Sequence, residues 1–265
     1  MQLLNSGSFL LEPVIGASLY ALFPMSIVLM NDVVGAILAS IALAVVKIPE
    51  LEKIEREEQH FLAEIKEGLQ VFKENKKLFY IVIAEALCMF FYAPLSSFYP
   101  LMTSDYFKLS AMYGSAVELS FAMGMMISSL LFSSVLKINR KIRVSFIGLF
   151  GMGVISLLCG IIPPTYVGWF FFAGGCICLG ACGNVHTIPL TAYIQETISP
   201  EKMGRAFSVF TLISSVTMPI DLLFSSPIAE KVGGNVCFFI SGLCMIFLTS
   251  GVAIHYSVKY RNLLG

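Results

Sequence analysis

Charged residues are scarce in this sequence, and neither sign of charge dominates. Only 13% of its 265 residues are Asp, Glu, Lys or Arg, whereas a soluble globular domain carries about 25%. Lys plus Arg and Asp plus Glu both number 17, so no net positive field is available to hold a nucleic-acid backbone. Because 57% of the residues are hydrophobic, a soluble fold of this length could not cover them. The composition therefore excludes a soluble enzyme, a disordered protein and a nucleic-acid binder.

Recognisable catalytic and metal-binding motifs are also missing. The sequence contains no phosphate-binding loop, no HExxH stretch and no Ser/His/Asp arrangement typical of a hydrolase. Its seven cysteines all fall within apolar runs, where they are expected to pack as small buried hydrophobes. Cys178 and Cys182 lie one helical turn apart, but no further cysteine lies on a polar loop to complete a metal site. We therefore expect no enzyme activity, no metal and no cofactor.

Long apolar runs are abundant, and each is close to the ~20 residues with which a helix crosses a bilayer. Pro24, Pro163-Pro164 and Gly233-Gly234 separate neighbouring runs. No two-residue alternation is present over these runs, so backbone hydrogen bonding in lipid requires helices. The sequence predicts an all-α polytopic membrane protein with eight transmembrane helices, at residues 3–23, 25–47, 78–101, 112–136, 142–162, 166–190, 205–227 and 235–257.

The basic residues predict an orientation for these spans. When the loops are sorted alternately by side, one side carries 15 of the 17 Lys and Arg residues and the other only Lys108 and Lys231. Such an asymmetry is typical of cytoplasmic loops. We therefore expect both termini to be cytoplasmic, together with the charged segment 48–77.

That charged segment has the pattern of an amphipathic helix. Apolar residues recur at three-, four- and seven-residue steps between Glu and Lys residues, namely Ile54, Phe61, Ile65, Leu69 and Phe72. It is too charged to span a bilayer. It is expected to be a connector on the membrane surface or under the bundle, with a partner-binding helix as the alternative.

The order of two spans, a charged cytoplasmic segment and six further spans resembles the major facilitator superfamily without its first four transmembrane helices. Short motifs place the resemblance in the macrolide-efflux-like branch of drug exporters. These motifs are Asn31-Asp32 with Ser40, Glu67-Gly68-Leu69 followed by Asn75 and Leu78, and Pro189, Gln195, the stretch from Pro200 to Ser208, and Pro219.

This resemblance implies a partial major-facilitator fold. Residues 1–47 would be the last two helices of the N-terminal half, residues 48–77 a cytoplasmic linker helix, and residues 78–265 a complete six-helix C-terminal half. Six residues would be structural parts of family motifs: Pro13, Gly16, Pro200, Gly204, Arg205 and Pro219. The element around Pro13 departs from the family pattern, since Glu12-Pro13-Val14-Ile15-Gly16-Ala17 replaces the usual glycine-rich form.

The implied activity is proton-coupled efflux of a hydrophobic or amphiphilic small molecule by alternating access, from a bacterial cell membrane. Two alternatives remain open. The chain could be a truncated, inactive remnant, or a membrane subunit that needs a separate chain to supply the missing helices.

Ionisable residues within spans are the candidates for chemistry, because each is costly to hold unpaired in hydrocarbon. They are Glu12, Asp32, Glu85, Glu118, His186, Asp221 and His255. We predict proton coupling at Glu85, Asp221 and Asp32. Glu118 and His255 lie near span ends and are expected to be structural. For His186, a hydrogen bond to a carbonyl is a more common role than a proton relay.

The predicted substrate site is built around Glu85. Met89, Tyr92, Ser96 and Tyr99 follow it at helical spacing, and a carboxylate beside a thioether and phenols suits a bulky, partly cationic ligand. Asn184 and Thr187 form a second polar stripe, and Thr217 lies on the face of Asp221. The alternative for Glu85 is a hydrogen-bonded carboxyl in helix packing, and for Asp221 a protonated carboxyl bonded to Ser214, Thr217 and Ser225.

Glycines on the 142–162 and 166–190 spans predict close helix crossings. They are Gly148, Gly151 and Gly153 on the former and Gly174, Gly175, Gly180 and Gly183 on the latter.

Overall fold

The structure is a computed structural model that describes residues 30, 33–38, 40–41, 61–134 and 140–259. Within these residues every regular element is a helix. From residue 61 onward the order is α3 (Phe61–Glu74), α4 (Lys76–Leu101), the π-helix η1 (Met102–Tyr106), α5 (Ala111–Ser134), α6 (Lys141–Gly160), α7 (Tyr166–Thr197), α8 (Pro200–Val232) and α9 (Gly234–Lys259).

Six of these helices, α4 to α9, are long and apolar enough to cross a bilayer. They coincide with the last six predicted spans, which are confirmed. The predicted spans at 3–23 and 25–47 lie outside the described residues, except for helical positions between residues 30 and 41. The all-helical class is therefore confirmed, and the total of eight spans stays a prediction.

Local sequence signals determine where several helices begin. The Asn75 side chain accepts a hydrogen bond from the Leu78 nitrogen (3.2 Å), which caps α4 and separates it from α3. Thr165 caps α7 in the same way through Gly168 (2.9 Å), directly after Pro163 and Pro164. Helix α7 continues to Thr197, seven residues beyond the predicted end, because it accommodates Pro189 in its interior.

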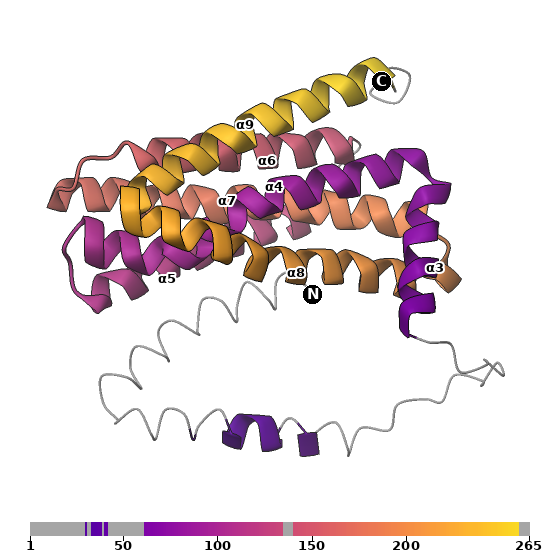
Figure 1. The fold of residues 1–265 in the computed structure, drawn as a ribbon, viewed down its shortest axis with the longest axis horizontal. Helices are drawn as coiled ribbons and strands as arrows, with labels where there is room; N and C mark the ends of the chain where they lie inside the picture. The colour runs from indigo at the N-terminus through magenta and orange to yellow at the C-terminus, as the bar shows by residue number, and fades with distance from the viewer. Residues whose placement is uncertain (1–29, 31–32, 39, 42–60, 135–139, 260–265) are drawn as a thin grey trace.

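The six long helices lie side by side, and α3 crosses their ends on one side of the bundle (Figure 1). Helix α7 packs between α5 and α6, α6 packs against α9, and α4 packs against both α8 and α9. One buried cluster runs through the bundle and includes Leu95, Met102, Phe172 and Phe238. A second cluster, around Phe72, Leu78 and Ile194, lies at the end covered by α3.

Glycines mark the close crossings, but only some of the predicted ones do so. A Cβ at Gly180 would stand 2.0 Å from the Phe121 carbonyl oxygen, so α5 and α7 touch backbone to backbone there. A Cβ at Gly148 would likewise meet the α7 backbone, whereas one at Gly151 or Gly175 would meet a cysteine sulfur and one at Gly153 would stand 3.0 Å from Ile246. By contrast, Gly174 and Gly183 have nothing within 4 Å of a Cβ, so the prediction was wrong for these two.

Helix α3 confirms the predicted amphipathic helix over residues 61–74. Its Phe72 is buried, and a Cβ at Gly68 would stand 2.8 Å from the Arg205 carbonyl oxygen on α8. Glu74 Oε2 and Lys202 Nζ pair at 2.9 Å, so the end of α3 lies beside the first turn of α8. The linker residues 48–60 lie outside the described residues.

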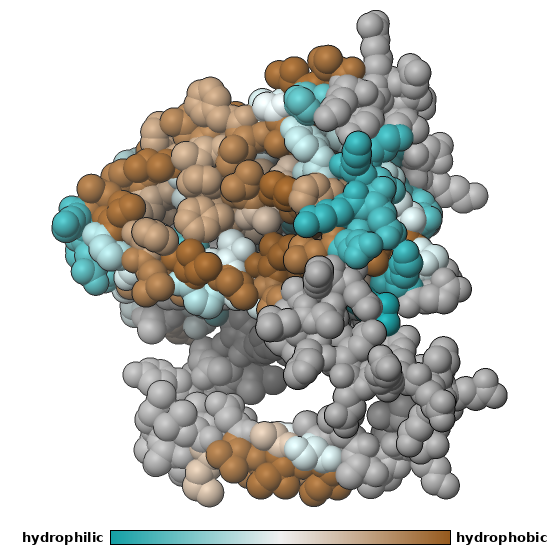
Figure 2. All heavy atoms as spheres, turned by 45° about the vertical axis from the view of Figure 1, so that its right-hand side comes forward, coloured by the Kyte–Doolittle hydropathy of each residue, from teal (hydrophilic) through white to brown (hydrophobic). Residues whose placement is uncertain are grey.

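Polar and apolar side chains are distributed as expected for a chain in a bilayer. Hydrophilic residues gather toward the ends of the bundle, and hydrophobic residues cover the flank between them (Figure 2). Lys141 on α6 pairs with Glu196 on α7 at the end that also carries α3. The exposed apolar flank includes Ile147, Phe171, Leu223 and Phe247, which suits contact with acyl chains.

Candidate functional site

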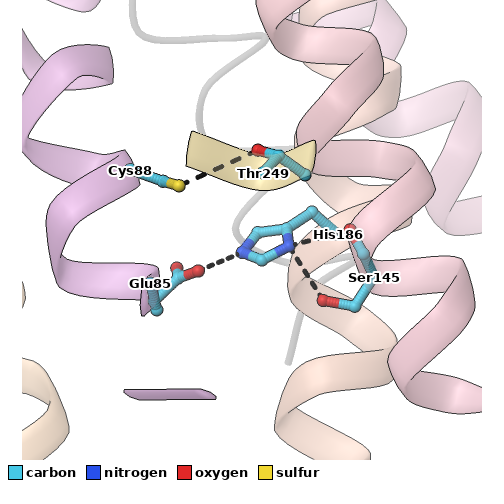
Figure 3. A network of polar contacts seen from close by, with 5 residues as sticks. All are labelled: Glu85, Cys88, Ser145, His186 and Thr249. Atoms are coloured by element: carbon cyan, nitrogen blue, oxygen red, sulfur yellow. Dashed lines mark hydrogen bonds and ion pairs between the residues drawn. The ribbon is translucent and has the colours of Figure 1, made fainter. Parts of the chain in front are cut away.

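Glu85 and His186 come together in the interior of the bundle. Glu85 lies on α4 and His186 on α7, and only 8% and 2% of these residues are exposed. The Glu85 Oε2 atom lies 2.6 Å from His186 Nε2 (Figure 3). A carboxyl and an imidazole at this distance, away from water, form the polar centre of the bundle.

The other ring nitrogen of His186 faces Ser145 on α6. His186 Nδ1 lies 2.9 Å from the Ser145 hydroxyl oxygen and 3.1 Å from the Ser145 carbonyl oxygen. The expected contact of His186 with a carbonyl is thus present at Nδ1. The other ring nitrogen, Nε2, faces Glu85 instead. The ring connects three helices, because Glu85, Ser145 and His186 belong to α4, α6 and α7 (Figure 3).

A glycine on α6 makes this arrangement possible. A Cβ at Gly148 would stand 2.5 Å from the His186 nitrogen and 2.8 Å from the Cys182 carbonyl oxygen, both backbone atoms of α7. Gly148 lies three residues after Ser145, so the two residues share one face of α6. Only a residue without a side chain lets α6 approach α7 closely enough for Ser145 to reach the ring.

Further polar contacts surround this centre. Cys88, one turn after Glu85, lies with its sulfur 3.8 Å from the Thr249 hydroxyl on α9 (Figure 3). The Asn184 amide on α7 donates to the Met125 carbonyl (2.6 Å) and to the Ser129 hydroxyl (2.8 Å), both on α5. Polar groups in lipid tend to form such interhelical hydrogen bonds, which here connect α4, α5, α6, α7 and α9 in pairs.

Residues 1–220 match the Major Facilitator Superfamily. The chain belongs to this family. It is 35% identical over 246 residues to Macrolide efflux protein A from Streptococcus pyogenes, covering 92% of the chain and 60% of that relative. It is 34% identical over 222 residues to Macrolide efflux protein A from Enterococcus faecalis, covering 83% of the chain and 68% of that relative. No solved structure matches the chain.

These matches confirm the predicted family and its macrolide-efflux-like branch. They also confirm the broad class, a multi-pass membrane protein that is not an enzyme. The chain spans about 60% of the length of the Streptococcus pyogenes relative.

The predicted substrate site stays a prediction, and the described residues place its members as follows. Two hollows near the other end of the bundle have volumes of about 510 and 530 Å³, and none of the seven residues lines either. Met89 and Tyr92 are half-buried against the main cluster, and Thr217 donates to the Ile213 carbonyl of its own helix (2.7 Å). Thr187 is half-buried, and the Ser96 side chain lies outside the described part.

Asp221 is buried at a different depth from Glu85. At 1.5 Å per residue, Glu85 lies about 14 Å from the start of α4 and Asp221 about 32 Å from the start of α8. Among the described residues, Asp221 Oδ2 and the Ser225 hydroxyl have no hydrogen-bond partner. The predicted bonding between Asp221 and Thr217 or Ser225 is therefore absent there, and the side chain of Ser214 is not described.

The remaining predicted residues take various positions. Glu12, Pro13, Gly16 and Asp32 lie outside the described residues. Pro200, Gly204 and Arg205 begin α8, where a Cβ at Gly204 would meet nothing within 4 Å, and Pro219 lies exposed inside that helix. Glu118 is half-buried on α5, and the exposed His255 stacks on Tyr80 with ring centroids 5.1 Å apart.

In the part of the chain that is described, no group of three or more His, Cys, Asp and Glu side chains could hold a metal ion. The sequence identified Glu85, Asp221 and His186 as intramembrane ionisable groups, but it did not indicate that Ser145 or Ser129 would accompany them. A serine in an apolar span is common, so no sequence signal distinguished these two.

Proposed function

We propose that this chain belongs to a secondary active transporter that exports a hydrophobic or amphiphilic small molecule across the bacterial plasma membrane, driven by protons. Membership in the Major Facilitator Superfamily supports a transporter. Two relatives at 34–35% identity are named for macrolide efflux, so macrolides are the first substrates to test.

One observation supports proton coupling above all others, and it is the buried contact between Glu85 and His186. Two ionisable groups in the interior lose hydration, and apolar side chains of similar volume would stabilise a bundle at least as well. Ionisable residues inside membrane spans are generally functional for this reason. Burial disfavours the charged form of a carboxyl, so a carboxyl that is dry in one state of a transporter and hydrated in another can carry a proton.

The substrate would bind along the α4 face that begins at Glu85. Met89, Tyr92 and Ser96 continue that face, and Asn184, Thr187 and Thr217 would contribute from α7 and α8. A carboxylate beside phenols and a thioether favours an amphiphile with a positive charge. Asp221 and Asp32 would be further proton sites, at other depths or in the N-terminal segment.

Alternating access would occur between residues 1–47, with any helices that precede them, and the six-helix unit 78–265. The linker 48–77 would lie on the cytoplasmic side with both termini. The basic residues Lys141 and Lys202, at the end of the bundle that carries α3, support this orientation.

The test is efflux from proteoliposomes that contain the full-length protein and carry an imposed pH gradient. Glu85→Gln keeps the shape and a hydrogen-bonding group but removes the titration. We expect it to abolish uphill efflux and to leave substrate binding within about tenfold, or 1.4 kcal/mol. Glu118→Gln is the matched control, because it neutralises a half-buried carboxyl outside the predicted site, and it should pump at the parent rate. If Glu85→Gln also pumps at the parent rate, Glu85 does not carry the proton.

A further inference from the structure

We propose that one proton is held jointly by Glu85 and His186, and that the Ser145 backbone carbonyl determines which nitrogen of the ring shares it. The proposal rests on the proposed function for its role in transport. Its test is a titration that can succeed or fail independently of transport.

The first step concerns the Nδ1 side of the ring. Nδ1 lies 3.1 Å from the Ser145 carbonyl oxygen, and a carbonyl oxygen can only accept a hydrogen bond. This contact is a hydrogen bond only when the ring donates from Nδ1, and the proposal assigns that form to the ring. The Ser145 hydroxyl, 2.9 Å from Nδ1, can rotate to accept from the same N–H. A neutral His186 ring thus carries its hydrogen on Nδ1 and presents a lone pair on Nε2.

The second step concerns the Nε2 side. A lone pair on Nε2 and an ionised carboxylate are both acceptors, and two acceptors repel at the observed 2.6 Å. A proton on either partner converts the repulsion into attraction, although the 2.6 Å contact does not have the direction of a hydrogen bond from Nε2. The proton can reside on Glu85 or on His186, and in either case the pair has no net charge.

The third step concerns the cost of changing this state. Loss of the proton leaves one negative charge in the interior, and uptake of a second leaves one positive charge, and both are opposed by desolvation. The proton therefore passes to water only when the site becomes hydrated, which leaves the carboxylate and the neutral ring behind.

Other ionisable groups on the packed helices could influence the pair. Cys88 lies one turn from Glu85 on the same face of α4. The others include Tyr80 and Tyr92 on α4, Glu118 on α5, the exposed Arg143 on α6, Cys182 and Tyr193 on α7, Arg205 and Asp221 on α8, and His255 and Tyr256 on α9. Lys141 and Lys202 are paired with Glu196 and Glu74.

The experiment follows both partners in the full-length protein in lipid nanodiscs. ¹⁵N spectra of labelled histidine report each ring nitrogen of His186, and infrared difference spectra report the Glu85 carboxyl band. Signals are assigned with His186→Gln and Glu85→Gln. We expect Nδ1 to remain protonated across the titration and the ring and carboxyl to titrate with a common midpoint. Replacing either partner should move the midpoint of the other by about one pH unit or more.

Two further variants make the test specific. His255→Gln removes an exposed histidine stacked on Tyr80 and should leave both signals in place. Ser145→Ala removes the hydroxyl but keeps the carbonyl, so Nδ1 should remain protonated in it. Independent midpoints for ring and carboxyl, or an unprotonated Nδ1, would overturn the proposal. A common midpoint in a protein that shows no proton-driven efflux would instead overturn the proposed function and leave the shared proton standing.

Discussion

Gly148 on α6 touches the backbone of α7 at His186. A Cβ at this glycine would stand 2.5 Å from the His186 backbone nitrogen. The same crossing places Ser145 against the histidine ring. The position of the His186 ring, and therefore its contact with Glu85, depends on Gly148, which has no side chain.

Gly148→Ala should destabilise the bundle. The atoms in the way belong to the α7 backbone and cannot rotate aside, so α6 must move. We expect a loss of about 1–3 kcal/mol, the usual cost of overpacking, measured as a lower unfolding temperature in detergent. The ¹⁵N signal of His186 Nδ1 should shift as Ser145 withdraws.

Gly183→Ala on α7 is the matched control for this variant. It has nothing within 4 Å of a Cβ, and alanine favours helix by about 1 kcal/mol over glycine. Its unfolding temperature should be equal to that of the parent or higher. If the two alanine variants are equally stable, the close crossing is not a tight contact in the protein.

Asp221→Leu should stabilise the chain while impairing transport. A buried carboxyl oxygen without a hydrogen-bond partner among the described residues is costly, by about 1–3 kcal/mol. Leucine is of similar size and avoids that cost. We expect a higher unfolding temperature together with slower proton-driven efflux, whereas Asp221→Asn should have a smaller effect on efflux than Glu85→Gln. A lower unfolding temperature for Asp221→Leu would show that the carboxyl has a structural partner.

Gly68→Ala should loosen α3 from α8. Its Cβ would meet the Arg205 carbonyl oxygen at 2.8 Å and the Val209 side chain at 2.4 Å. Amide hydrogen exchange across residues 61–74 should accelerate by about tenfold, which corresponds to 1.4 kcal/mol of lost docking energy. Gly204→Ala on α8, with nothing within 4 Å, should leave the exchange unchanged.

Glu74→Gln should have little effect on the same exchange rates. The pair of Glu74 with Lys202 is about half exposed, and exposed pairs typically contribute about 0–1 kcal/mol. A larger effect from Glu74→Gln than from Gly68→Ala would mean that charge, and not packing, holds α3 in place.

Cysteine labelling tests the orientation of the bundle. In a background without the seven native cysteines, Ser110→Cys and Gly234→Cys should react with an impermeant thiol reagent in intact cells. Ser199→Cys should react only after permeabilisation, because it precedes the cytoplasmic start of α8 in the proposed topology. Labelling of Ser199→Cys in intact cells would invert that topology.

The sequence alone determined the six described spans, their approximate ends and the family. These features are local, since an apolar run of sufficient length must be helical in lipid, and Asn75 and Thr165 cap helices through their own neighbours. Helix α7 nevertheless extends to Thr197, seven residues beyond the predicted end, because Pro189 in its interior does not end it.

Only the tertiary structure decided which faces meet. Glu85 and His186 are 101 residues apart, and their contact depends on how α4 and α7 are rotated about their axes. Gly180 and Gly183 are both glycines of α7, and the sequence does not distinguish them. Gly180 nevertheless lies in a tight crossing with α5, whereas Gly183 faces open space. A span buries its apolar side chains equally well in lipid or against a neighbouring helix, so hydrophobicity does not fix rotation. Close backbone contacts and interhelical hydrogen bonds fix it, and these require all the helices at once.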